Sequence, residues 1–401
     1  MILVLGALVA LGPLTIDMYL PALPNIADQL SVTESVVQLT LTGTLAGLAL
    51  GQLIVGPLSD SLGRRRPLIA GIILHVVASL VCLAAPNIEV LAVGRVLQGM
   101  GAAAAAVVAL AVVGDLYSGS AAATVMSRLV LVLGVAPVLA PTLGALVLRH
   151  GAWPWVFAAL ALAAVGLLLV AVFALPETLP VARRRDLHGR SIARTYLKLF
   201  RDIRFVVLIG VAALGMAGLF AFISAAPFVL QGRYGMDQQT FALVFSAGAV
   251  VLIGSTQFNV VLLRWFAPQR IMLWALAVAA VVGVVFLVLA FTHTGGVVGF
   301  LAPVWGILAA IGLVLPNAPA VALSRHPEAA GTAAATLGAA QFGVGAAVAP
   351  LVGVLGNNEI ALAVVMATSV TVALVALLAV SAGTGAVESE TADPDRVGEP
   401  A

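Results

Sequence analysis

Long apolar stretches, separated by short polar or Pro/Gly-containing breaks, run along most of the chain. A helix needs about 20 apolar residues to cross the hydrocarbon core of a bilayer, and these stretches are long enough. Polar breaks, proline and glycine mark helix ends. The pattern predicts an all-α integral membrane protein with twelve transmembrane helices, at about residues 2–27, 34–57, 67–86, 89–113, 123–147, 152–175, 204–230, 238–263, 270–291, 297–321, 329–354 and 359–381.

The stretches divide into two sets of six around a more polar segment. We expect a first half at residues 1–178, a linker at 179–203, a second half at 204–382 and a disordered acidic tail at 383–401. In the linker, apolar residues recur at helical spacing opposite a basic set: Ile192, Tyr196, Leu199 and Ile203 against Arg190, Arg194, Lys198 and Arg201. This pattern is typical of an amphipathic helix on an anionic inner leaflet, with a solvated linker as the alternative.

The distribution of basic residues predicts the orientation. The odd-numbered loops carry Arg149 and Arg233, whereas the even-numbered loops hold Arg64 to Arg66, the cluster around 183–204, Arg264, Arg270 and Arg325. Basic residues near membrane ends favour the cytoplasm. Both termini are therefore expected on the cytoplasmic side of the membrane.

Composition excludes several classes of protein. Of the 401 residues, 62% are hydrophobic and 9% charged, whereas a soluble domain carries about a quarter charged residues. A soluble enzyme or a nucleic-acid-binding protein is therefore excluded. Cys82 is the only cysteine and the five histidines are scattered, so no disulfide, metal site or cofactor is expected. No phosphate-binding or nucleophile motif indicates an enzyme. We interpret His75 as a packing residue.

The most specific motif lies between the second and third predicted helices and reads Gly56-Pro-Leu-Ser-Asp60-Ser-Leu-Gly63-Arg64-Arg65-Arg66-Pro67. Gly56 would let two helix ends approach closely, Gly63 would permit a tight turn, and Asp60 could accept from an arginine near a helix N-terminus. The loop resembles the signature of the major facilitator superfamily, which implies two pseudo-symmetric six-helix halves. In that family such a network latches the cytoplasmic side, while a plain basic loop is the alternative.

Further matches support the same resemblance. Arg95-Val-Leu-Gln98-Gly99 is similar to the family's R-x-x-Q-G motif. The stretch with Gly134, Pro137, Pro141 and Gly144 resembles the Gly/Pro-rich motif of drug antiporters, although Ala140 and Ala145 replace two of its glycines. Residues 13–24, Pro-Leu-Thr-Ile-Asp-Met-Tyr-Leu-Pro-Ala-Leu-Pro, resemble the first helix of the Bcr/CflA drug-resistance exporters. The resemblance implies a drug:proton antiporter.

Two ionisable residues lie inside predicted helices, Asp17 in the first and Arg95 in the fourth. An ionisable group in the bilayer is costly and indicates function. In this family both helices border the central cavity, so we expect the two side chains to approach each other. A change in their distance would alter the proton affinity of Asp17 and couple proton to drug. A static ion pair, or an Asp17 that caps backbone near Pro13 and Pro21, is the alternative.

Other polar and aromatic residues are weaker candidates. Asp115 and Arg128, at cytoplasmic helix ends, are expected to join Asp60, Arg64 and Arg65 in the gate. The candidates for the cavity wall are Tyr19, Gln38, Gln98, Phe222, Gln257, Asn317 and Gln341. Each polar one could instead form a bond between helices.

The sequence thus favours a proton-coupled exporter of lipophilic drugs, such as chloramphenicol-, bicyclomycin- or sulphonamide-like compounds. A proton-coupled transporter of one metabolite, such as a sugar or amino-acid derivative, is the alternative. The expected partners are small-molecule drugs, protons and the lipid bilayer, with no nucleic acid. A monomer powered by the proton gradient, without a cofactor, is the simplest state.

Overall fold

The computed structural model describes residues 1–184 and 189–391. The helices of the first half are α1 (Ile2–Asp17), η1 (Leu20–Ala22), α2 (Leu23–Gln29), α3 (Glu34–Leu62), α4 (Arg65–Leu83), α5 (Ile88–Leu116), α6 (Gly119–His150) and α7 (Pro154–Ala174). The linker contains η2 (Val181–Arg183) and α8 (Gly189–Arg201). The second half has α9 (Ile203–Pro227), the π-helix η3 (Phe228–Arg233), α10 (Gln238–Leu262), α11 (Pro268–Thr292), α12 (Gly296–Leu323), η4 (Pro327–Ala329), α13 (Ala330–Val354) and α14 (Glu359–Thr391).

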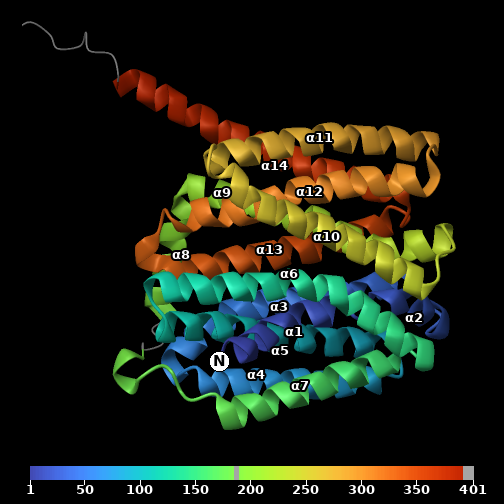
Figure 1. Ribbon diagram of the computed structural model, residues 1–401, viewed down its shortest axis with the longest axis horizontal. Coiled ribbons are helices and arrows are strands. Elements are labelled where there is room, and N and C mark those ends of the chain that lie inside the picture. The colour runs from blue at the N-terminus through green and yellow to red at the C-terminus, as the bar shows by residue number, and fades with distance from the viewer. Residues whose placement is uncertain (185–188, 392–401) are drawn as a thin grey trace, which may run out of the picture.

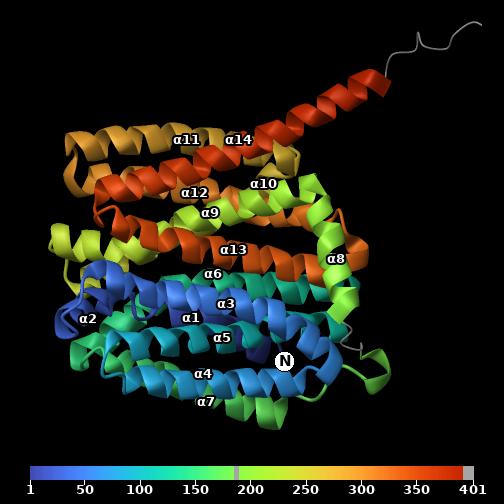
Figure 2. The ribbon, with the colours of Figure 1, turned by 180° about the vertical axis from the view of Figure 1, so that it is seen from behind.

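Twelve segments of the described chain are long and apolar enough to cross a membrane, which confirms the predicted spans. They form two six-helix halves, stacked one above the other in Figure 1. The halves meet where α3 packs against α13 and α6 packs against α10. We call the end with the α3–α4 turn and the linker the linker end, and the end with α2 the far end. In Figure 2 the linker end is on the right.

The first span is not the single helix that the sequence suggests. Its α-helix stops at Asp17 and resumes at Leu23 after the short η1. Pro21 and Pro24 lack the N–H groups that the carbonyls of Asp17 and Leu20 would accept in a continuous helix. The break therefore leaves polar backbone beside a buried carboxylate.

Local signals set the other helix ends that matter for the site. Asp202 accepts from the N–H of Arg204 and Phe205 and begins α9, and Asp237 accepts from the N–H of Thr240 and begins α10.

The structures of the linker and the tail agree only in part with the predictions made from the sequence. The linker contains the expected helix, α8, in which Leu199 is buried and Phe200 exposed. The side chains of Arg190 and Ile192 lie outside the described residues. Helix α14 continues to Thr391, beyond the helix end expected at residue 381 and into the tail expected to be disordered. Residues 392–401 of the acidic tail lie outside the described residues.

Candidate functional site

The last residue of α1 is a buried carboxylate. Asp17 is 3% exposed, and its Oδ1 has no hydrogen-bond partner in the part of the chain that the structure describes. The neighbouring carbonyl of Met18 lies against Gly144 of α6, where a Cβ would come within 1.8 Å of the carbonyl oxygen. Only glycine allows this approach. One residue of the Gly/Pro-rich motif thus packs directly beside Asp17.

Arg95 of α5 is fully buried in the same half. Its guanidinium carbon lies 3.9 Å from the centre of the Tyr19 ring, a cation–π contact. Its Nη1 donates to Gln98 Oε1 at 2.9 Å, whereas Nε and Nη2 have no partner among the described residues. No hydrogen bond or ion pair joins Asp17 to Arg95 within the described ranges; the Arg95 guanidinium instead lies over Tyr19 and donates to Gln98. Their approach stays a prediction for another state.

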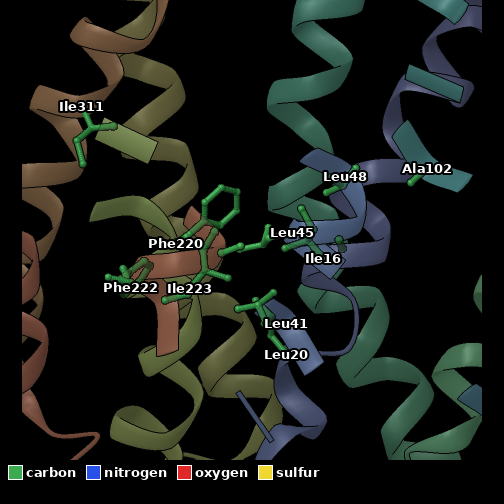
Figure 3. Close-up of a cluster of buried hydrophobic side chains, with 14 of the residues drawn as sticks. Ile16, Leu20, Leu41, Leu45, Leu48, Ala102, Phe220, Phe222, Ile223 and Ile311 are labelled. Atoms are coloured by element: carbon green, nitrogen blue, oxygen red, sulfur yellow. The ribbon is translucent and has the colours of Figure 1, made fainter. Parts of the chain in front are cut away.

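Apolar side chains from both halves meet beside Ile16 and Leu20 of the first span. Figure 3 shows Leu41 and Leu45 of α3 pointing toward Phe220 and Ile223 of α9. Each of these four residues is less than 10% exposed. We call this group, together with Ile16, Leu20 and Phe222, the apolar wall. Phe222 also stacks on Phe245 of α10 with 5.4 Å between ring centres.

Hydrogen bonds close the two halves onto each other at the far end. Gln38 of α3 donates to the carbonyl of Ser224 at 3.1 Å and to Asn357 Oδ1 at 2.7 Å. Ser35 donates to the carbonyl of Gly353 at 3.0 Å. Gln231 of η3 donates to the carbonyl of Pro21 at 3.3 Å. Gln38 therefore lies between the halves and contributes to their closure at the far end.

The remaining cavity candidates are scattered. Tyr19 and Gln98 are buried within the first half beside Arg95. Asn317 exchanges hydrogen bonds with Asn259 of α10, donating at 2.6 Å, so it joins two helices of the second half. Gln257 is exposed, and Gln341 is half-buried. Tyr19 and Gln98 thus lie beside Arg95. Phe222 belongs to the apolar wall, and Gln38 bonds to the residue that follows Ile223 of that wall.

At the linker end, Arg64 gathers the expected acidic partners. Its Nε donates to Asp115 Oδ2 at 2.9 Å and its Nη1 to Asp60 Oδ1 at 2.5 Å. Gly63 has φ +91, which makes the expected tight turn. Arg128, by contrast, is exposed and forms no ion pair with this cluster among the described residues.

One expectation for this motif is wrong. A Cβ on Gly56 would meet no atom within 4 Å, so Gly56 does not allow a close approach of helices in this structure. The close approach occurs at Gly63, where a Cβ would lie 2.4 Å from Glu177 Oε2.

Sequence reasoning missed two members of the charge cluster, Glu177 and Thr178, which follow α7. Glu177 accepts from the N–H of Arg64 at 2.8 Å and of Arg65 at 3.2 Å, and so caps α4. Burial raises the pKa of the Glu177 carboxyl, but backbone N–H donors and nearby Arg184 outweigh it and lower the pKa. Thr178 donates to Asp115 at 2.9 Å. The Pro-Glu-Thr sequence after a transmembrane helix was the available signal.

The motif on α6 also contributes to the contact between halves. Pro137 and Pro141 lie inside the helix and remove two backbone donors. Ser246 of α10 donates to the carbonyl of Val138 at 2.6 Å, and a Cβ on Gly134 would touch Ile253 of α10 at 3.3 Å. The motif therefore packs against α1 with Gly144 and against the second half with Gly134. In the described ranges, no group of three His, Cys, Asp or Glu residues could hold a metal ion.

Comparison with known proteins identifies the family to which this chain is similar. The model of the Major Facilitator Superfamily matches residues 5–350. The chain is 33% identical to a bicyclomycin resistance protein homolog of Haemophilus influenzae, over 88% of each chain. It is also 33% identical to a chloramphenicol resistance protein of Pseudomonas aeruginosa, covering 83% of this chain and 79% of the relative.

A solved D-xylose-proton symporter has the same fold, with a TM-score of 0.72 at 16% identity, over 94% of this chain and 96% of the symporter. The family match, the two resistance proteins and the twelve spans in two halves agree with one another. The chain belongs to the Major Facilitator Superfamily of membrane transporters, among relatives that include drug-resistance proteins.

Proposed function

We propose that the protein exports lipophilic small molecules in exchange for protons, by alternating access between the two halves. One observation carries the proposal: Asp17 is a buried carboxylate whose Oδ1 has no hydrogen-bond partner among the described residues, at a helix break beside the contact between the halves. A buried carboxylate inside a membrane span is expensive and indicates a proton or ion pathway. The proton gradient supplies the energy.

The surfaces around Asp17 favour lipophilic cargo. The apolar wall offers aliphatic and aromatic side chains from both halves, with Phe220 and Phe222 as the largest. Broad-specificity binders use such adaptable contacts instead of fixed polar ones. The resistance relatives suggest bicyclomycin- and chloramphenicol-like compounds as the first cargo to test, with sulphonamide-like compounds as a third class.

We further propose that the linker end faces the cytoplasm of a bacterial inner membrane, because the basic loops gather there. Both termini would then be cytoplasmic and the far end would face outward. In this orientation the bonds of Gln38 and Ser35 close the path to the outside. The cluster of Asp60, Arg64 and Asp115 lies at the opposite gate.

The proposed cycle moves one proton onto Asp17 and off again. When the halves open outward, the carboxylate takes a proton from the outer solution and becomes neutral. After the change to the state closed on the far side, cargo from the cytoplasm or inner leaflet binds at the apolar wall. Binding shifts the position of Asp17 relative to Arg95, and the proton leaves to the cytoplasm. Neutral and charged Asp17 thus favour different states.

Everted vesicles with an acid-inside proton gradient test this cycle. Bicyclomycin or chloramphenicol is added, and the loss of the gradient is followed. We expect drug-dependent loss with the wild type and none with Asp17→Asn. Asp28→Asn is the matched control, because Asp28 is an exposed carboxylate on the adjoining α2, and it should behave as the wild type. Drug-dependent loss with Asp17→Asn would contradict the assignment of the proton to Asp17.

A further inference from the structure

Inside the first half, a series of hydrogen-bonded side chains leads away from Arg95, and its four other members have no part in the cycle described above. Its members are Thr15 on α1, His75 and Ser79 on α4, and Arg95 and Gln98 on α5. All five are 0% exposed. The series connects Arg95 to the segment of α1 that ends at Asp17, by a route through α4.

Near Arg95, all the hydrogen bonds of this series have the same donor direction. Arg95 donates to Gln98 Oε1 at 2.9 Å, which orients the amide and leaves Gln98 Nε2 to donate to Ser79 Oγ at 2.8 Å. Ser79 has one hydroxyl proton and donates it to the backbone carbonyl of His75 at 2.7 Å. Each group in this part donates away from the guanidinium.

The same reasoning fixes the role of the imidazole. Thr15 donates its only hydroxyl proton to the carbonyl of Leu11 at 2.6 Å. Its Oγ1 can therefore only accept from His75 Nε2, which is 2.9 Å away. His75 is thus a donor at Nε2, and it is the side chain that joins α4 to α1.

Close backbone packing holds His75 in this position. On α5, a Cβ on Gly101 would lie 2.7 Å from the Cβ and 2.8 Å from the backbone nitrogen of His75. On the other side, Ser79 bonds to the His75 carbonyl within the same helix. These contacts restrict the backbone of His75, so its side chain can hold α1 in place through the bond to Thr15.

We infer that His75 is a positioning residue for the proton exchange. By donating from Nε2 to Thr15, it holds the Thr15–Tyr19 segment in register with Arg95, so that Tyr19 covers the guanidinium and Asp17 ends α1 at the break. This role rests on the proposed function and deepens it. Loss of the His75–Thr15 bond lets the Thr15–Tyr19 segment shift relative to Arg95, so that proton binding and cargo binding are no longer coupled.

The test compares coupled with uncoupled transport in vesicles. For each variant, uphill drug transport driven by a proton gradient and downhill drug exchange without a gradient are both measured. The variants that remove the bond are His75→Leu and Thr15→Val. The matched controls that keep it are His75→Gln, whose amide nitrogen can replace Nε2 as donor, and Thr15→Ser, which keeps the hydroxyl.

We expect His75→Leu and Thr15→Val to lower uphill transport about tenfold, which corresponds to the loss of one buried hydrogen bond. Downhill exchange should persist, and the two controls should transport as the wild type does. Thr15→Val keeps the test valid if His75→Leu does not accumulate in the membrane.

Three results would overturn this role. They are full coupling in both bond-removing variants, equal loss of uphill and downhill transport, and failure of His75→Gln to rescue. If the wild type itself moves no proton with drug, the proposed exchange fails first, and the role of His75 with it.

Discussion

Replacing Gly144 by alanine tests whether the motif on α6 sets the position of α1. The new methyl carbon would lie 1.8 Å from the carbonyl oxygen of Met18 and 2.8 Å from its carbonyl carbon. The two backbones must separate by at least about 1.2 Å, the difference between 1.8 Å and a 3.0 Å contact. Such overpacking costs about 1–3 kcal/mol. Because the obstacle is a backbone atom, a side-chain rotation cannot relieve it.

The displaced element is the end of α1, directly after Asp17. A misplacement of about 1 Å can lower a rate by up to about a hundredfold where geometry matters. We therefore expect Gly144→Ala to reduce proton-driven drug transport by at least about tenfold and to lower the melting temperature of the purified protein.

Gly166→Ala on α7 is the matched control. A Cβ there would meet no atom within 4 Å, so the change should stabilise the helix by about 0.5–1 kcal/mol. Transport should be unchanged. If Gly144→Ala melted and transported like Gly166→Ala, the contact between α6 and α1 would not constrain Asp17, and the reasoning would be refuted.

Two further predictions concern polar groups outside the apolar wall. Glu177→Gln should lower the melting temperature at pH 7. The difference from the wild type should shrink as the pH falls through the lowered pKa of Glu177, because a carboxylate with a depressed pKa stabilises the fold only while it is ionised. A difference in melting temperature that is constant with pH would contradict this. Asn317→Ala should destabilise by about 0.6–1.7 kcal/mol, because it leaves the buried Asn259 amide without its partner, while proton-driven transport stays intact. Loss of transport at full stability would instead place Asn317 in the cargo path.

The number of spans and the pair of Asp60 with Arg64 could be predicted because both depend on local sequence. Apolar length and short breaks gave the twelve spans, and the motif placed Asp60 four residues before Arg64. The partnership of Asp115 with Arg64 needed only the even-numbered loops to share one end of the bundle.

The missed features depend on contacts between distant segments. Glu177 caps a helix that begins more than a hundred residues earlier, and no periodicity links the two. His75 has no neighbouring histidine or carboxylate in sequence, so its bond to Thr15 follows only from the way that α1 and α4 both pack against α5. The break in α1 was indicated by Pro21 and Pro24, but the apolar run around them concealed it.

The break after Asp17 also divides the first span mechanically. The long segment α1 packs on α5 and α6 of its own half, whereas η1 also contacts α9 and α10 of the other half, and Gln231 bonds to Pro21 there. In the proposed alternating access, α1 would move with its own half, whereas the part after the break is held by contacts from both halves. A change in backbone conformation would then fall between Met18 and Leu23, directly after Asp17, where the α-helical bonding is interrupted.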